Sequence, residues 1–427
     1  MNDTGSMRIG TQRQLIERQR FFIAGAVVFA AVVPALVRFL IFPDALSDTP
    51  ALHSVLANLL AIGTSVWMRL SIGQYPGNRS ASLLVPTILV AHAINAMIFL
   101  FTRVNYDRLL LLLGLVGHLV WALLLELSIR RHSRLRIGMI PGGSVEQLRE
   151  IDWVEWSPIP EPRLDLTSGC DALVADFSVD LTAPWEAFLA DAALEGRVIF
   201  QVKQLAESLT GKVAIDHLSE NSFGTLVPSR GYYYLKEAGD FLFALVVLPV
   251  VIVPMLLVGL AIRLDSRGPA LFRQRRVGRA GRPIIIYKFR TMRLLDEAAD
   301  TRAAAMTGAA DDRITRVGAV LRQYRIDELP QIINILKGQM SWIGPRPEAE
   351  VLSSWYTGEI PFYRYRHVVK PGISGWAQVT QGHVAEVDQI IEKLQYDFFY
   401  IKYFSPWLDL LIVMKTMRTM LSGFGAR

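Results

Sequence analysis

Residues 311–347 of the chain read DDRITRVGAVLRQYRIDELPQIINILKGQMSWIGPRP. Two adjacent carboxylates at the centre of this stretch, Asp327 and Glu328, precede Pro330, a residue favoured in the first turn of a helix. The pattern therefore predicts that the carboxylate pair lies at the start of a helix. On its amino-terminal side the pair follows a basic run made of Arg313, Arg316, Arg322 and Arg325.

This placement has chemical consequences for the pair. A helix start favours anions, so it would keep Asp327 ionised and able to attack. Nearby arginines can grip phosphoryl oxygens in forked hydrogen bonds, and the second carboxylate, Glu328, can hold Mg²⁺ through oxygen. The same residues also fit a simple helix cap beside a solvated charged face, and the pair alone does not decide between these two readings.

Further motifs around this stretch occur in a fixed order. With them the last two-fifths of the chain resembles the bacterial sugar transferase family, the monotopic phosphoglycosyl transferases. The order of a polytopic front end, a nucleotide-fold-like middle and this domain resembles the longer, hexose-transferring members. The segments that carry the resemblance are GPALFRQRRVG (268–278), YKFRTM (287–292), RITRVG (313–318), DELPQ (327–331), GPRP (344–347) and KPGISGWAQV (370–379).

The resemblance implies a reaction. A hexose 1-phosphate would pass from a UDP-sugar, UDP-glucose or UDP-galactose, to undecaprenyl phosphate with release of UMP, as the first membrane step of exopolysaccharide, capsule or O-antigen synthesis. Asp327 would form a covalent aspartyl-phosphosugar intermediate and Glu328 would bind Mg²⁺. The residues expected to bind substrate phosphates are Arg346, Arg273, Lys288, Arg322 and Arg325. Many members carry Asn-Gly-Arg where this chain has Gln381-Gly382-His383, which leaves the role of that arginine unassigned here.

Composition indicates a membrane protein of several domains. The 427 residues are 52% hydrophobic, with a mean hydropathy of +0.30. The net charge of +6 is modest, so we expect no nucleic-acid partner and assign the basic residues that flank apolar segments to anionic lipid. A single cysteine, Cys170, excludes an internal disulfide and any multi-cysteine metal site, which suits soluble parts in a reducing cytoplasm.

The front of the chain predicts a membrane bundle. A polar tail, residues 1–20, precedes four transmembrane helices within residues 21–130. The tail and residues 130–136 are both basic, which places both on the cytoplasmic side of a bacterial inner membrane. The apolar segments lie near 21–42, 51–73, 81–102 and 108–129.

Residues 131–230 alternate between strand-like and helix-like segments. This pattern predicts a small, degenerate Rossmann-like α/β domain. Gly138, Gly142 and Gly143 do not form GxGxxG, so a structural or regulatory role is favoured over a nucleotide site. The expected strands are 135–143, 171–176, 198–202 and 212–216, with a helix over 184–194.

Residues 231–264 form the next apolar segment, and two features argue against a simple crossing. Pro249 and Pro254 interrupt the backbone donors of a helix, and basic residues, Lys236 and Arg263, lie on both sides. The pattern predicts a re-entrant membrane helix that breaks at these prolines, with an ordinary fifth span as the alternative. Residues 265–427 then form a mostly α-helical (α+β) catalytic domain that faces the cytoplasm.

Two other functional classes remain open at this point. The chain would be a non-catalytic membrane scaffold if its middle domain bound nucleotide without turnover, or a small-molecule transporter if the four spans carried the function. Both leave the motif-rich carboxy-terminal domain unexplained. The expected partners are therefore a UDP-sugar, undecaprenyl phosphate and the lipid bilayer, and the sequence is compatible with a homo-oligomer.

Overall fold

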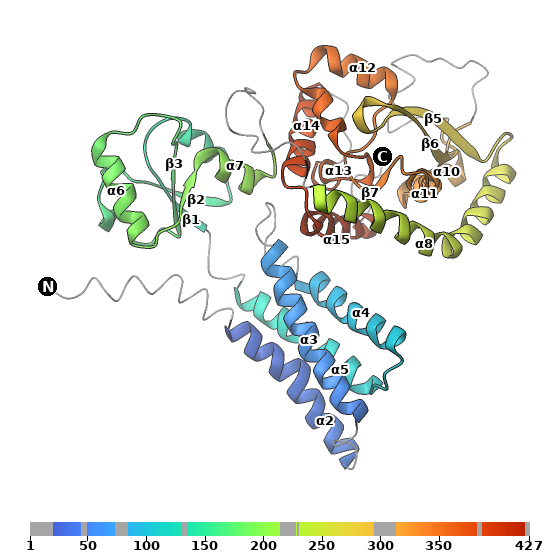
Figure 1. Ribbon diagram of the computed structural model, residues 1–427, viewed down its shortest axis with the longest axis horizontal. Helices are drawn as coiled ribbons and strands as arrows, with labels where there is room; N and C mark the ends of the chain where they lie inside the picture. Colours follow the sequence, from blue (N-terminus) through green and yellow to red (C-terminus); the bar gives the residue numbers. More distant parts are fainter. Residues whose placement is uncertain are drawn as a thin grey trace. The chain divides into compact units, whose positions relative to one another are not determined.

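The computed structural model describes residues 20–43, 49–72, 84–129, 135–213, 228, 230–293, 313–381 and 387–422 (Figure 1). The chain divides into two compact units at Gly211 and Lys212. The first unit contains a helical bundle and a small α/β domain, and the second contains a long apolar helix and the motif-rich region.

The bundle consists of apolar helices at the positions that the sequence predicts. A continuous helix over Arg20–Ile41 contains a π-turn, η1 (Val28–Val32), followed by α2 (Val33–Ile41). Pro34 at the start of α2 has no N–H to donate, which accounts for the widened turn before it. The other three helices are α3 (Thr49–Ile72), α4 (Leu84–Thr102) and α5 (Arg108–Ile129).

All four helical segments are long and apolar enough to cross a membrane. Their outer surface carries exposed apolar side chains such as Leu40 and Phe101, 78% and 75% exposed. Inside the bundle, polar groups join neighbouring helices: the Asn58 amide donates to the Leu110 carbonyl at 3.0 Å. These contacts have the form of helix packing within a membrane.

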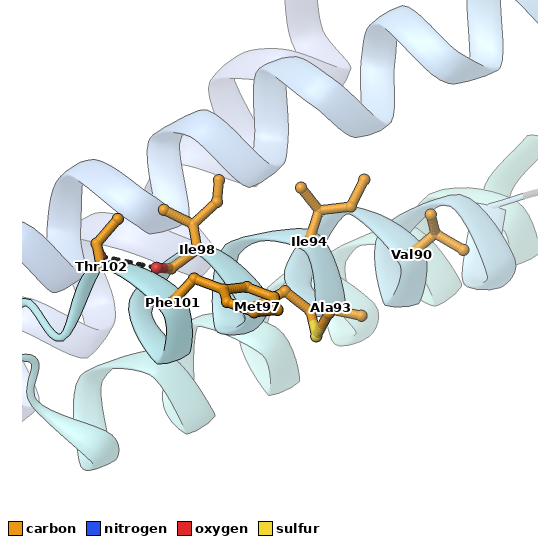
Figure 2. Close-up of a pocket in the computed structure, with 7 residues that line it drawn as sticks. All are labelled: Val90, Ala93, Ile94, Met97, Ile98, Phe101 and Thr102. Atoms are coloured by element: carbon orange, nitrogen blue, oxygen red, sulfur yellow. Dashed lines mark hydrogen bonds between the residues drawn. The ribbon is translucent and has the colours of Figure 1, made fainter. Parts of the chain in front are cut away.

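A shallow groove follows the outer face of α4 (Figure 2). Its lining is wholly apolar apart from the Thr102 hydroxyl, which donates to the Ile98 carbonyl of its own helix. A groove with no charged group suits hydrocarbon chains and offers nothing to bind a phosphate. The lining residues are Val90, Ala93, Ile94, Met97, Ile98, Phe101 and Thr102.

The α/β domain contains a four-stranded parallel sheet in the order β2-β1-β3-β4. Alternate residues of β3 face opposite sides: Leu173 packs with α6 and Val174 packs with α7, so the sheet is covered on both faces. The strands are β1 (Leu135–Met139), β2 (Val154–Pro158), β3 (Ala172–Ala175) and β4 (Ile199–Gln201), and the helices are α6 (Ala183–Leu194) and α7 (Val202–Thr210), with 3-10 turns η4 (Val145–Glu150) and η5 (Leu164–Thr167).

Two details of this domain differ from the sequence prediction. Strand β2 was not expected, because its sequence VEWSP is half polar and ends in proline, which is tolerated at the edge that β2 occupies. A strand over 212–216 was expected, but Lys212 and Val213 form none, and residues 214–216 lie outside the described residues. Instead the Val213 N–H donates to the Gln395 carbonyl, so tertiary contact replaces sheet pairing.

The second unit is mostly helical, as predicted, and is built around two short pairs of strands. Strands β5 (Leu271–Val277) and β6 (Pro283–Phe289) form an antiparallel hairpin, and β7 (Ser341–Ile343) pairs in parallel with β8 (Gly372–Ser374). The helices and 3-10 turns are α8 (Arg230–Asp265), η7 (Arg279–Gly281), α10 (Arg316–Gln323), η8 (Ile326–Gln331), α11 (Ile332–Leu336), α12 (Glu350–Glu359), η9 (Tyr363–Val368), α13 (Trp376–Thr380), α14 (Val387–Lys402) and α15 (Pro406–Ser422).

Helix α8 remains helical through Pro249 and Pro254 and bends along its course (Figure 1). Both of its ends contact the same unit. Near the start, Lys236 pairs with Asp409 of α15 at 2.7 Å, and near the end Ile262 packs with Phe289 and Leu321. Between these anchors one face packs against α11, and the other exposes large apolar side chains that include Val250, Leu256 and Leu264, 73%, 69% and 80% exposed.

Candidate active site

The adjacent carboxylates lie in the first turn of η8, which continues directly into α11. Arg325 precedes them with a φ of 55°, in the left-handed region that a residue with a side chain rarely adopts. Arg325 separates the end of α10 from the start of η8, so Asp327 and Glu328 directly follow the junction of two short helices. The helix start that Pro330 predicts is therefore a 3-10 turn.

Glu328 is buried, and one of its oxygens receives two cations. Lys288 Nζ from β6 and Arg346 Nη2 from the Gly-Pro-Arg-Pro loop each lie 2.9 Å from Oε1. Burial by itself would raise the pKa of Glu328, but the charges of Arg346, Lys288 and Arg325 outweigh it and hold that pKa well below its usual range. Glu328 is therefore a permanent anion at neutral pH.

The second oxygen of Glu328, Oε2, is buried and has no hydrogen-bond partner among the described residues. An ionised carboxylate with one free, buried oxygen fits a Mg²⁺ ligand. No group of three or more His, Cys, Asp or Glu side chains is close enough to hold a metal within the described part of the chain. A Mg²⁺ ion at Glu328 would therefore rely on substrate phosphates and water for most of its ligands, which is common for this ion.

Asp327 is partly exposed and differs electrostatically from its neighbour. Burial raises the pKa of Asp327 and the charge of Glu328 adds to this, while Lys288, Arg346 and Arg322 oppose it, with a net upward shift. The helix start alone would have favoured ionisation, so the cost of burial dominates here. Asp327 is the more basic carboxylate of the pair, which suits a nucleophile, and Glu328 is the fixed anion.

The cations of the site are partly buried. Burial lowers the pKa of Lys288 to about 8, against the opposing attraction of Glu328. The charge of Glu328 raises the pKa of Arg346. Arg322 donates from Nε to Thr291 Oγ1 at 3.0 Å and its charge acts on Asp327, while that of Arg325 acts on Glu328. The structure thus brings together Lys288, Arg346, Arg322 and Arg325 around the two carboxylates.

Arg273 is not brought to this cluster. In the β5–β6 hairpin Arg273 is paired with Tyr287, and Phe272 is paired with Lys288. Paired residues share one face of the hairpin, and neighbouring residues of a strand point to opposite faces. The Arg273 guanidinium lies over the Tyr287 ring, 5.8 Å from its centroid. Arg273 therefore lies on the face of the hairpin opposite to Lys288 and the carboxylates.

Arg276 is the cation that the sequence reasoning missed. It lies an even number of residues from Phe272, on the same face as Lys288, and donates from Nη1 to the Pro347 carbonyl next to Arg346. Burial, with the repulsion of Arg346, lowers the pKa of Arg276 to about 10. Period-two alternation along β5 separates Arg276 from Arg273, but only the register of β5 against β6 shows which of the two shares a face with Lys288.

The α/β domain, which is the middle domain of the chain, is the alternative place for a nucleotide site. In open parallel sheets ligands bind beyond the carboxyl ends of the strands where the strand order reverses, here between β1 and β3. Asp176 fills this position: Oδ2 accepts from the Ser144 N–H and hydroxyl at 2.9 and 2.8 Å, and Oδ1 accepts from those of Ser178 at 3.0 and 2.5 Å. A fixed carboxylate would repel a phosphate at this point, which argues against the scaffold hypothesis.

The segment that departs from the family pattern is only partly described. Gln381 Nε2 donates to a carboxylate oxygen of Glu392 at 2.7 Å and to the Gln389 carbonyl. Gly382 and His383 lie outside the described residues. Gln381 therefore ties the end of α13 to α14.

Comparison with known proteins identifies similar chains. Residues 231–423 match the family model described as bacterial sugar transferase. A protein of Aeromonas hydrophila named UDP-N-acetylgalactosamine-undecaprenyl-phosphate N-acetylgalactosaminephosphotransferase is 42% identical over 355 residues, which is 83% of each chain. UDP-glucose:undecaprenyl-phosphate glucose-1-phosphate transferases are also similar: that of Xanthomonas campestris pv. campestris is 39% identical over 50% of this chain and 44% of its own, and that of Escherichia coli K12 is 38% identical over 43% and 39%.

Proposed function

The chain belongs to the bacterial sugar transferase family, and on this premise we propose that it transfers a sugar 1-phosphate from a UDP-sugar to undecaprenyl phosphate and releases UMP. The observation that carries the proposal is the partly exposed Asp327 beside a buried Glu328. Glu328 is held by Lys288 and Arg346, and within the described ranges its second oxygen has no hydrogen-bond partner. A nucleophile surrounded by phosphate-binding cations is what phosphoryl transfer requires.

The reaction proceeds in two displacements. A carboxylate oxygen of Asp327 attacks the β-phosphorus of the UDP-sugar, the bond from that phosphorus to the bridging oxygen breaks, and UMP leaves with the bond electrons. A phosphate oxygen of undecaprenyl phosphate then attacks the aspartyl-bound phosphorus, and its bond to Asp327 breaks. The products are the diphosphate-linked lipid sugar and the restored carboxylate.

The surrounding residues act by binding charge. Arg346, Lys288 and Arg276 neutralise the oxygens of the transferred phosphoryl group, and Arg322 and Arg325 extend this positive surface around η8. Glu328 fixes Lys288 and Arg346 in place through Oε1. Mg²⁺ held by Oε2 of Glu328 would supply further positive charge for the diphosphate.

The sequence resemblance and the names of the similar proteins point to two kinds of donor sugar. The sequence resemblance favours UDP-glucose or UDP-galactose, and two of the similar proteins are named for UDP-glucose. The similar protein that aligns over 83% of each chain is named for UDP-N-acetylgalactosamine. An assay must therefore compare hexose and N-acetylhexosamine donors directly.

We further propose that α8 is re-entrant and that the second unit, Lys212–Arg427, which we call the catalytic unit, faces the cytoplasm. A straight helix of 36 residues would be about 54 Å long and would place its ends on opposite sides of a hydrocarbon core of about 30 Å. Both ends of α8 contact the same unit, through Lys236 and Asp409 at one end and Ile262 and Leu321 at the other. The exposed apolar face would enter one leaflet and bring the site to the lipid phosphate.

Cysteine labelling tests this topology in intact cells. With Cys170 replaced by serine, single cysteines at the exposed positions Arg230 and Arg267 should both resist a membrane-impermeant reagent until the cells are opened. Pro43→Cys, between the first two spans, should react from outside and serves as the control. Reaction of Arg267→Cys from outside, with Arg230→Cys protected, would establish an ordinary fifth span.

The function is tested by UMP release from purified protein in detergent. The donors are UDP-glucose, UDP-galactose and UDP-N-acetylgalactosamine, with and without undecaprenyl phosphate and Mg²⁺. Turnover should require the lipid, and Asp327→Asn should lower it by at least about a thousandfold with the fold intact. A variant that keeps a tenth of the activity would remove Asp327 from the role of nucleophile.

A pre-steady-state measurement separates the covalent step from the overall function. Without lipid acceptor, the wild-type protein should release a burst of one UMP per active site, because the first displacement can proceed alone. Turnover with lipid but no burst without it would favour direct transfer. No UMP release with any donor would reject the transferase function for this chain.

A further inference from the structure

The loop that carries Arg346 is held at successive residues. The carbonyl of Pro345 accepts from the Gly372 N–H at 2.9 Å, and the carbonyl of Pro347 accepts from Arg276. The carbonyl of Arg346 itself accepts from Arg366 Nη2 at 3.0 Å. These contacts fix the backbone on both sides of Arg346, the phosphate-binding arginine. The contact to the carbonyl of Arg346 itself comes from the buried guanidinium of Arg366.

All three nitrogens of the Arg366 guanidinium donate hydrogen bonds. Its side chain is 3% exposed, and Nε and Nη2 donate to Asp397 Oδ2 at 3.0 and 2.7 Å. Nη1 donates to the Tyr363 hydroxyl at 2.8 Å. A lysine has one ammonium group and cannot meet these partners together with the Arg346 carbonyl.

Two further charges, both partly buried, complete a quartet around the buried pair of Arg366 and Asp397. Glu348 lies 3.7 Å from Arg366 Nη1 and pairs with Lys393, so the quartet contains two cations, Arg366 and Lys393, and two anions, Asp397 and Glu348. Asp397 and Lys393 are both on α14. Buried charges persist when they are paired in this way, and their hydrogen bonds fix geometry more than they add stability.

We propose that Arg366 is a positioning residue for the transferase reaction: held by Asp397, it fixes the Arg346 backbone so that the Arg346 guanidinium is aimed at Glu328 and at the substrate phosphate. Arg366 makes no contact with Asp327 or Glu328 among the described residues and acts only through Arg346. Small displacements of a phosphate-binding group are costly, because binding and transfer both depend on its placement.

The proposal rests on the proposed function and makes a prediction that a general stabilising role does not. If Arg366 acts through Arg346, its loss should matter only while Arg346 is intact, so the two substitutions should not be additive. If Arg366 only stabilises the domain, its substitution should lower the unfolding temperature and leave UDP binding unchanged. If Arg366 affected binding independently of Arg346, the two losses should multiply. The test is therefore a double-mutant cycle on ligand binding, with the unfolding temperature measured in parallel.

The cycle compares wild type, Arg366→Lys, Arg346→Lys and the double variant, with the Kd for UDP measured by calorimetry in the presence of Mg²⁺. Each single substitution should weaken UDP binding about tenfold, the effect of losing one hydrogen bond to a charged group. The double variant should match Arg346→Lys to within about twofold. A double variant weakened about a hundredfold would overturn the proposal, whereas wild-type protein that does not bind UDP would reject the proposed function instead.

Two further variants keep the result interpretable. Asp397→Asn preserves shape while removing the charge that holds Arg366, and it replaces Arg366→Lys in the same cycle if the latter does not fold. Arg290→Lys is the matched control, because Arg290 is equally buried and donates to the carbonyls of Ser266 and Arg267. Arg290→Lys should lower the unfolding temperature and leave the Kd for UDP unchanged. When it is combined with Arg346→Lys, the Kd for UDP should equal that of Arg346→Lys alone.

Discussion

Asp176 of the α/β domain and Glu328 of the catalytic unit are both buried carboxylates, 4% and 5% exposed, and their surroundings differ. Each oxygen of Asp176 accepts two hydrogen bonds from neutral groups, all from Ser144 and Ser178. Glu328 pairs with two cations through one oxygen, and its other oxygen accepts no hydrogen bond from the part of the chain that the structure describes. A carboxylate satisfied by its own loops has a structural task, whereas one with an excess of positive charge around it is prepared for an anionic substrate.

The reach of the partners along the sequence differs in part. Ser178 is two residues from Asp176, so two of the four hydrogen bonds are local, while the other two come from Ser144, 32 residues away. Lys288 is 40 residues from Glu328, so that arrangement exists only when the hairpin and η8 are assembled. The comparison therefore separates a loop that stabilises its own fold from a site that the fold assembles.

The largest effect in this comparison is expected for Glu328→Gln. The substitution removes the negative charge that fixes Lys288 and Arg346 and weakens the free oxygen as a metal ligand, so turnover should fall by about a hundredfold or more. The Mg²⁺ concentration needed for half-maximal activity should rise. The measurement is UMP release over a range of Mg²⁺ concentrations.

Asp176→Asn is the matched control for this change, since it also replaces a buried carboxylate by its amide. It should leave UMP release unchanged within about twofold, because the substituted group contacts only its own loops. Equal losses of activity in the two variants would mean that the middle domain has a direct part in turnover.

A smaller effect, on the KM for the UDP-sugar, should distinguish Arg346 from Arg273, both of which the sequence predicts to bind phosphate. Arg346→Lys should raise the KM for the UDP-sugar about tenfold, because a lysine cannot reproduce the forked contact. Arg273→Lys should change the KM by less than about twofold, since Arg273 lies over Tyr287 on the other face of the hairpin. Steady-state kinetics of the two variants decides the matter, and a larger effect of Arg273→Lys would place substrate on the outer face of the hairpin.

The sequence predicts these features unevenly, for physical reasons. Apolar segments of membrane-spanning length and the helix start before Pro330 are local patterns, and the structure has helices and η8 at those places. Distinguishing Arg276 from Arg273 needs the register of β5 against β6, which no local pattern determines. Arg366 and Asp397 are 31 residues apart and meet only through tertiary packing, so their pairing is invisible in the sequence.

The smallest effect concerns the stability of the middle domain and its dependence on pH. Burial would raise the pKa of Asp176, but the hydrogen bonds from Ser144 and Ser178 outweigh it and lower that pKa from 3.8 to about 2. A carboxylate with a depressed pKa stabilises the folded state above its unfolded value and loses that contribution as pH falls through the folded value. Asp176→Asn should therefore cost about 2 kcal/mol at neutral pH and progressively less between about pH 4 and 2.

Hydrogen exchange of the full chain in detergent measures this difference directly. Amides of β1 and β3 should exchange about thirtyfold faster in Asp176→Asn at pH 7, after correction for intrinsic rates, and at nearly the wild-type rate near pH 2. A difference that does not vary with pH would mean that the carboxylate charge contributes nothing. Added UDP could instead protect these amides in Asp176→Asn. This result would mean that removing the charge creates an anion site at the point where the strand order reverses. Asp176 would then be the group that excludes nucleotides from the middle domain.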